Sequence, residues 1–92
     1  MQIVIQNKED LPNKIFRYIK WKLYGLSDKF KKLNHIDVHI KSLSTKFALY
    51  EMVIKFGLKG KDIVVKQQAE NVMTLFNNIY KVAHMKLAEV HR

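Results

Sequence analysis

Basic and aromatic side chains are concentrated in the first third of the sequence. Residues 11–32 carry seven lysines and arginines against one acid, Asp28, a local charge of +6, whereas residues 67–92 sum to only +1. Cations hold phosphate groups and flat rings stack on bases, so this composition is typical of a surface that binds nucleic acid. The alternative is a charged face that only keeps the domain in solution.

Other constellations in the sequence do not support catalysis or metal binding. His35 and His39 fall in a predicted strand, where four residues span about 13 Å, too far for one metal ion. His84 and His91 are two helical turns apart, which makes them surface residues able to touch an anion when protonated. Residues 57–62 lack the spacing of a phosphate-binding loop and lie between two predicted strands. We therefore expect no enzymatic activity, no metal and no cofactor.

Length, charge and cysteine usage bound the class of protein. The chain has 92 residues and a net charge of +9, which favours one domain over residues 1–92 and a polyanionic partner. The absence of cysteine fits a reducing cytoplasm. No apolar run reaches the roughly 18 residues of a membrane span, and residues 1–6 are too short for a signal peptide. We expect a soluble, untargeted, cytoplasmic domain.

The first half of the chain predicts a strand followed by a helix. Residues 2–6 predict a strand, and a helix is expected to start near residue 11 with Asp10 as its N-cap and Pro12 in its first turn. The helix is expected to end at Gly25 or within residues 26–28. Its apolar stripe is formed by Ile15, Phe16, Ile19, Leu23 and Leu26. Its outer side is expected to carry Lys14, Arg17, Tyr18, Trp21 and Tyr24.

The second half predicts three strands and a closing helix. Strict alternation predicts a half-buried strand over residues 35–41, and two opposed faces predict a second strand over 47–56. The β-rich run 63–65 predicts a third strand over 62–66, after glycines for a tight hairpin at 57–61. Helical spacing of apolar residues from residue 69 predicts a long amphipathic helix. The fold class is therefore α+β, in the order β-α-β-β-β-α, with a four-stranded sheet and two helices packed side by side on one face.

The outer face of the predicted sheet is more apolar than exposure to solvent requires. It is expected to include Phe47, Leu49, Val53 and Val64. Such a face indicates a contact surface or coverage by a neighbouring part of the chain. Two acids, Asp37 and Glu51, share this face and are expected to pair across strands with Lys55 or Lys41.

The element order, the basic first helix and the closing helix together resemble the ribosome hibernation promoting factor and protein Y family, also called ribosome-associated inhibitors. The resemblance covers nearly the whole chain. Residues 15–19, 22–23 and 26–30 are similar to that family's first helix, and residues 36–40 to the strand that follows it. Residues 69–76 and Ile79 are similar to the start of its second helix.

The resemblance implies binding in the channel of the small ribosomal subunit, where messenger and transfer RNA would lie, which blocks translation while preserving idle ribosomes. It implies small-subunit rRNA as the partner, with no membrane and no small-molecule substrate. Short family members leave ribosome pairing to a separate dimerising factor. The residues expected to contact rRNA are Arg17, Lys20, Trp21, Lys22, Lys29, Lys31, Lys32, Lys81 and Lys86, with Tyr18 as a second stacking candidate.

Three positions depart from the family pattern. Gly25 stands where the family usually has a lysine, and Val82 and Met85 stand where its second helix usually carries lysine or arginine. The lysines expected to substitute from adjacent positions are Lys22, Lys81 and Lys86.

Two other functions stay open from the sequence alone. One is a double-stranded RNA-binding module outside the ribosome, which would read RNA shape and phosphates. The other is a protein-interaction regulator that uses the apolar outer sheet face. Three lysines of the hairpin and last strand are expected to lie away from the RNA-binding face: Lys59, Lys61 and Lys66.

Overall fold

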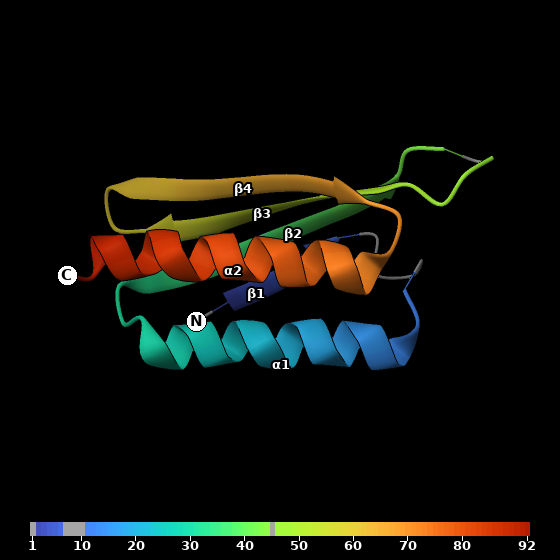
Figure 1. Cartoon of the computed structure of the whole chain (residues 1–92). Coiled ribbons are helices and arrows are strands. Elements are labelled where there is room, and N and C mark those ends of the chain that lie inside the picture. Colours follow the sequence, from blue (N-terminus) through green and yellow to red (C-terminus); the bar gives the residue numbers. More distant parts are fainter. Residues whose placement is uncertain (1, 7–10, 45) are drawn as a thin grey trace.

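The sheet has four strands in the spatial order β1-β2-β3-β4 (Figure 1). The computed structural model describes residues 2–6, 11–44 and 46–92. Its elements are β1 (Gln2–Gln6), α1 (Asn13–Lys29), β2 (Leu33–Ser42), β3 (Tyr50–Leu58), β4 (Lys61–Ala69) and α2 (Val72–Val90). β1 pairs with β2 in parallel, and the other neighbours are antiparallel. The predicted fold class and element order are confirmed.

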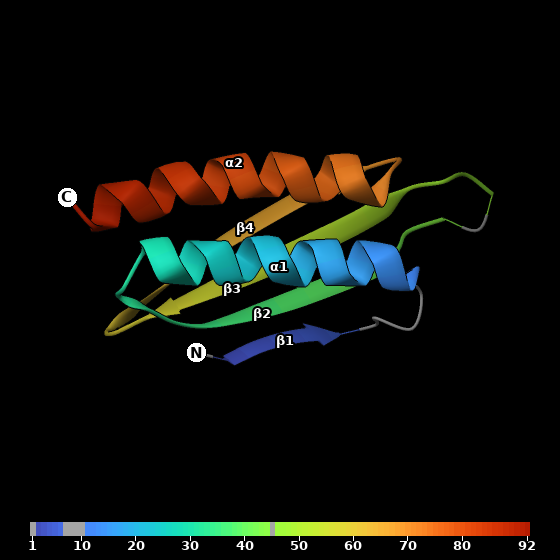
Figure 2. The same cartoon turned by 90° about the horizontal axis from the view of Figure 1, so that it is seen from below.

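Both helices lie side by side on one face of the sheet (Figure 2). α1 connects the parallel strands β1 and β2, and α2 follows β4, so the two helices run in the same direction. α1 packs on β2, and α2 packs on β3 and β4. Between the layers, the largest fully buried side chains include Phe56, Phe76, Ile19, Leu23 and Met52. Burial of these apolar side chains is the main force that fixes the helices on the sheet.

α1 continues past Gly25, one of the two predicted ends, and stops at Lys29. Leu26 is 1% exposed and keeps the chain helical, because leaving the helix at Gly25 would expose it. The last turn closes with the Phe30 amide donating to the Leu26 carbonyl over 2.8 Å. At its other end α1 begins at Asn13 with Pro12 as the N-cap residue, so the prediction of Asp10 as N-cap and Pro12 within the first turn was wrong; Asp10 itself lies outside the described residues.

The connection between β2 and β3 projects beyond the end of the sheet (Figure 1). The Leu43 amide donates to the Leu49 carbonyl over 2.8 Å, and Ser44 Oγ accepts from the amides of Lys46 and Phe47. These local bonds satisfy backbone groups that a longer strand would have paired across the sheet.

β3 therefore begins at Tyr50, and the predicted strand start near residue 47 was wrong. Phe47 and Leu49 belong to the projecting connection instead of the outer sheet face, and Phe47 is 74% exposed there. Of the four apolar residues predicted for that face, Val53 and Val64 lie within strands on it.

The open face of the sheet is lined by charged side chains. Glu51 pairs with Lys41 over 3.6 Å, as predicted, and also with Lys66 over 3.5 Å. Asp37 and Lys55 face each other in the register but pair with different partners: Asp37 with His35 over 3.8 Å, and Lys55 with Asp62 over 3.6 Å. The predicted pairing of Asp37 with Lys55 or Lys41 was wrong, because the partners of these three side chains are His35, Asp62 and Glu51.

Candidate nucleic-acid interface

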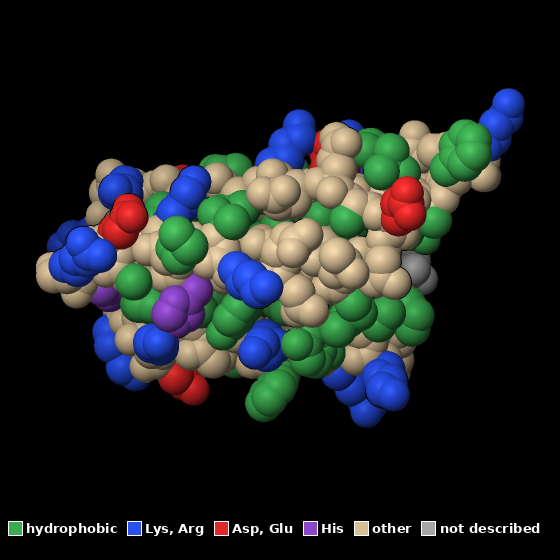
Figure 3. All heavy atoms as spheres, in the orientation of Figure 1, with side chains coloured by type: hydrophobic (Ala, Val, Ile, Leu, Met, Phe, Trp, Pro, Cys, Tyr) green, Lys and Arg blue, Asp and Glu red, His purple; other side chains and the backbone are tan. Residues whose placement is uncertain are grey.

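Positive charge is concentrated in the helix layer. Within the element bounds, the two helices carry seven cations against two acids, a net +5. The four strands carry four cations against three acids, a net +1. Figure 3 shows lysine and arginine side chains distributed along the helices, with hydrophobic side chains exposed between them. The helix layer is therefore the face of the molecule that attracts a polyanion.

We call the outer line along which α1 and α2 meet the helix seam. The residues that form it are Tyr18, Lys22, Gly25, Lys29, Asn77, Tyr80, Lys81 and His84. Because the helices are parallel, its cross-helix contacts follow one another in sequence order on both helices.

The first part of the helix seam is aromatic. Tyr18 is half-buried, with its ring edge-on to Phe76 at a centroid distance of 6.0 Å and its hydroxyl 3.5 Å from Asn77 Oδ1. The prediction that Tyr18 lies on the outer side of α1 was wrong, because α2 covers that flank of the helix. One turn further, Lys22 Nζ lies 4.6 Å from the centroid of the Tyr80 ring, a cation–π contact.

At the last contact of the helix seam and just beyond it, two lysines lie against histidines: His84 of α2, and His91, which directly follows α2. Lys29 Nζ lies 2.8 Å from Nε2 of His84. In the turn after α1, the Lys32 amide donates to Nε2 of His91 over 3.1 Å, and Lys32 Nζ donates to the Val90 carbonyl over 3.4 Å. An ammonium and an amide can only donate, so Nε2 of each histidine is the acceptor in this arrangement. Their lysines are held in position while keeping hydrogens free for a phosphate oxygen.

Arg17, Trp21 and Lys31 point into solvent. Trp21 is 68% exposed, and Lys22 Nζ lies 6.0 Å from its ring centroid. Arg17 is one turn from Trp21 on the same side of α1, so a cation and a flat ring lie next to each other. This is the arrangement that the basic and aromatic spacing predicted.

Two predicted contact residues lie away from the helix seam. Lys20 points toward β1, where it lines a hollow with Ile3 and Phe16 and its Nζ lies 5.7 Å from the Phe16 ring centroid. Lys86 is two residues after His84, about 200° further round α2. The structure therefore does not bring Lys20 and Lys86 together with the lysines of the helix seam.

Of the three positions that depart from the family pattern, one lies at the helix seam and two lie away from it. Gly25 is on the helix seam side of α1, next to Lys22, and an added Cβ there would meet nothing within 4 Å. Val82 lies one turn before Lys86, on the flank of α2 that faces away from α1. Met85, 66% exposed, is adjacent to Lys86.

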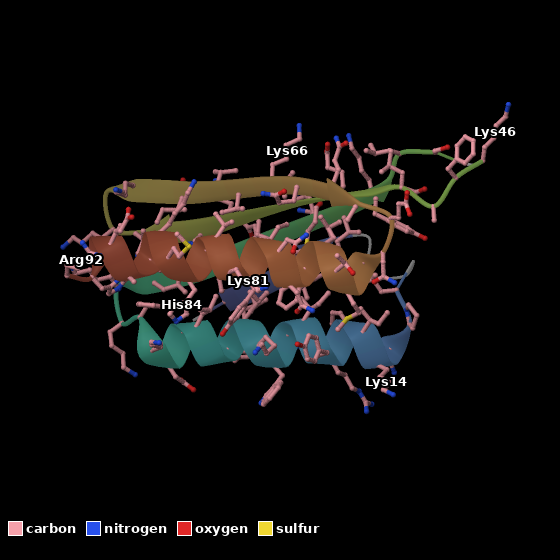
Figure 4. The ribbon with its side chains drawn as sticks, in the orientation of Figure 1. Lys14, Lys46, Lys66, Lys81, His84 and Arg92 are labelled. Atoms are coloured by element: carbon pink, nitrogen blue, oxygen red, sulfur yellow. The ribbon has the colours of Figure 1, made fainter. Side chains whose placement is uncertain are left out.

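The hairpin lysines lie closer to the predicted site than expected. Lys59 and Lys61 line one hollow together with Lys32 and Val90, at the end of the molecule where α1 and α2 both stop. The prediction that they lie away from the proposed RNA-binding face was wrong, because β2 and β3 are antiparallel and the β3–β4 and α1–β2 turns are therefore at the same end of the sheet (Figure 1). Lys66 points away from the helices (Figure 4).

Sequence reasoning missed Tyr80 as a member of this surface, and it identified His84 and His91 as surface residues able to touch an anion without placing them against Lys29 and Lys32. In Figure 4 His84 and Lys81 lie on the flank of α2 toward α1. The available signal was their spacing, since residues 77, 80, 84 and 91 repeat at helical intervals beside the buried stripe of α2. This spacing could be interpreted only with the knowledge that α1 packs on this flank of α2.

The architecture defines the class of fold, and solved structures share it. One is a ribosomal subunit interface protein from Coxiella burnetii, with a TM-score of 0.81 and 13% identity over 99% of this chain and 98% of that chain. Another is the N-terminal domain of protein Y from Thermus thermophilus, with a TM-score of 0.74 and 17% identity over 97% of this chain and 94% of that chain. No family model and no curated protein matches the sequence.

Proposed function

We propose that this protein is a ribosome-associated translation inhibitor that binds the small ribosomal subunit through its helix layer. The observation that carries the proposal is the charge difference between the layers, +5 on the helices against +1 on the strands. The fold shared with a ribosomal subunit interface protein and protein Y supports the ribosome as the source of the polyanion.

The helix layer contacts rRNA mainly through phosphates. Lys22, Lys29 and Lys32 act as positioned cations, because α2 holds each of them by a ring, an imidazole or a carbonyl. Arg17 and Lys31 add mobile charge in solvent. Such contacts give affinity and orientation without reading sequence. Occupying the channel of messenger and transfer RNA would block translation as a stoichiometric inhibitor, with no reaction catalysed.

The proposal also implies the binding partner of the protein and the cellular compartment in which it acts. The partner is small-subunit rRNA in the cytoplasm, and any pairing of ribosomes depends on a separate dimerising factor. Within the described residues, neither helix has the length and apolarity that a bilayer crossing needs.

Cosedimentation with purified small subunits tests the proposal. A protein that neutralises six or more phosphates loses about a thousandfold or more in affinity between 50 and 200 mM salt. We expect recovery with small subunits at low salt and loss at high salt. Negligible recovery at both salt concentrations would contradict ribosome binding.

A competition assay tests whether the protein prefers the small subunit over other RNA. Unlabelled RNA duplex at equal phosphate concentration should displace the protein from small subunits weakly. Equal displacement by duplex and by free subunits would favour a double-stranded RNA-binding module.

A protein contact is the second candidate, and the exposure of Phe47 favours it. This ring is 74% exposed on the connection between β2 and β3, well away from the helix seam. If Phe47→Glu converts a dimer to a monomer and leaves small-subunit recovery unchanged, the connection is a separate protein contact. An unchanged monomer would remove this candidate.

A further inference from the structure

A hollow opens on the outer side of α1 beside the helix seam. Its lining residues are Trp21, Lys22, Tyr24, Gly25, Asp28 and Tyr80. Trp21, Gly25 and Asp28 are at positions i, i+4 and i+7, so they lie above one another along about 10.5 Å of helix axis. The hollow thus has a flat ring at one end, a carboxylate at the other and a bare backbone between them.

Gly25 keeps the middle of the hollow empty. A glycine inside a helix is unfavourable relative to alanine, because it loses more backbone freedom on folding. Lack of space for a side chain does not explain the glycine at position 25, since an added Cβ would meet no atom within 4 Å. The residue therefore leaves space that any side chain would fill.

Asp28 is the second locally unfavourable residue at the same place. It is the one acid of α1 and lies in the last turn, where the helix dipole and its free carbonyls repel a negative charge. Among the described residues it takes part in none of the ion pairs, although cations surround it in sequence. Two residues that break local rules and face one hollow indicate a functional constraint.

We propose that this hollow binds one unpaired guanine of single-stranded RNA, an inference that rests on the proposed function for the RNA it belongs to. The base stacks on the Trp21 ring, as exposed aromatic side chains do in single-strand binding. The Asp28 carboxylate accepts hydrogen bonds from the base edge. Lys22 and Lys29 flank the hollow and hold the neighbouring phosphates.

Guanine is the base that matches a carboxylate. Its Watson–Crick edge presents two adjacent donors, N1–H and the N2 amino group, to the two carboxylate oxygens. Adenine, cytosine and uracil each have a single donor group on that edge, so the second carboxylate oxygen would meet an acceptor instead of a donor. Unpaired bases are the ones whose Watson–Crick edges are free for such recognition.

The single tryptophan makes the test direct, because quenching of Trp21 fluorescence reports stacking at this site alone. The probes are pentanucleotides of uridine with guanosine, inosine or adenosine at the centre, titrated at one fixed ionic strength. Inosine lacks only the N2 amino group. We expect the guanosine probe to bind at least about fivefold tighter than the other two, since a bidentate contact discriminates by that much or more.

Three variants assign the preference to the hollow. Asp28→Asn should abolish the guanosine preference, whereas Glu89→Gln, which removes an equal charge from an exposed acid on the far flank of α2, should keep it. Gly25→Leu should fold at least as stably as the natural chain but lose quenching by all three probes. Circular dichroism and urea unfolding confirm that each variant is folded.

Equal affinities for the three probes, or a guanosine preference that survives Asp28→Asn, would overturn the proposal. Unchanged quenching in Gly25→Leu would also overturn it. These outcomes are independent of ribosome binding, because the oligonucleotide titration contains no ribosome. A guanosine preference without small-subunit recovery would remove the ribosome and keep the base site, and the reverse result would do the opposite.

Discussion

The ammonium of Lys29 donates a hydrogen bond to Nε2 of His84 over 2.8 Å and so joins the two parallel helices. The same imidazole packs edge-on against the Phe30 ring at a centroid distance of 5.3 Å. His84 therefore has two roles, an apolar one toward the core and a polar one toward solvent. Lys29 keeps two further hydrogens for a phosphate while its position is set by α2.

Substitution of His84 should separate these two roles. His84→Ala removes the ring and the acceptor, and we expect it to lower the free energy of unfolding by about 1–2 kcal/mol. His84→Phe keeps the ring contact with Phe30, so its loss should stay below about 1 kcal/mol. Urea unfolding measures both. Equal losses in the two variants would show that the hydrogen bond, and not the ring, stabilises the contact.

Neutralising the lysines at the end of the helix layer should weaken binding to small subunits more than net charge alone explains. For the triple variant Lys29→Gln, Lys31→Gln and Lys32→Gln, the slope of log affinity against log salt should fall by about 2–3, since each lost phosphate contact removes about 0.7–0.9. Cosedimentation across a salt series measures this slope.

The matched control neutralises three lysines far from the helices: Lys41→Gln, Lys46→Gln and Lys55→Gln. Two of these lysines project from the open sheet face, and Lys46 lies on the projecting connection (Figure 4). Lys59 and Lys61 are unsuitable controls, because they share a hollow with Lys32. Equal loss of affinity in both triple variants would contradict the assignment of the site to the helix layer.

A side chain at position 57 should destabilise the fold while His35 is present. The two residues pair in the register of β2 and β3, and a Cβ on Gly57 would overlap the His35 ring. Gly57→Ala should lower the free energy of unfolding by about 1–3 kcal/mol, as overpacking does. The double variant with His35→Ala should recover most of that loss. Additive losses in urea unfolding would contradict this contact.

Glu51 should make stability fall as the solution is acidified. A hydrogen bond from Gln68 is the main cause that holds the pKa of this carboxyl below its ordinary value of 4.5, and Lys66 and Lys41 add to it against the opposing effect of burial. A lowered pKa in the folded state means that the stabilisation is present above pH 4.5 and is lost as the pH falls through the folded value.

The variant Glu51→Gln isolates this effect. Its free energy of unfolding should be lower than that of the natural chain at neutral pH, and the difference should shrink as the pH is lowered past 4.5. Urea unfolding at a series of pH values measures the difference. A difference that is constant with pH would show that the charge of Glu51 contributes nothing.

Local patterns in the sequence determined the elements and their buried faces. Alternation and helical spacing are properties of neighbouring residues, so the strands, both helices and the stripes that include Ile19 and Phe76 could be predicted without knowing what they pack on. The concentration of charge in residues 11–32 is likewise a property of the sequence alone.

The tertiary structure alone decided which of those charges lie together. A helical stripe fixes the direction of each side chain about its own axis, but the strand order decides which element lies on each flank. Because α2 packs beside α1, Tyr18 is covered, Lys22 and Lys29 meet rings of α2, and Lys20 points toward β1. These neighbours come from strand pairing between distant segments, and short-range spacing carries no information about such pairing.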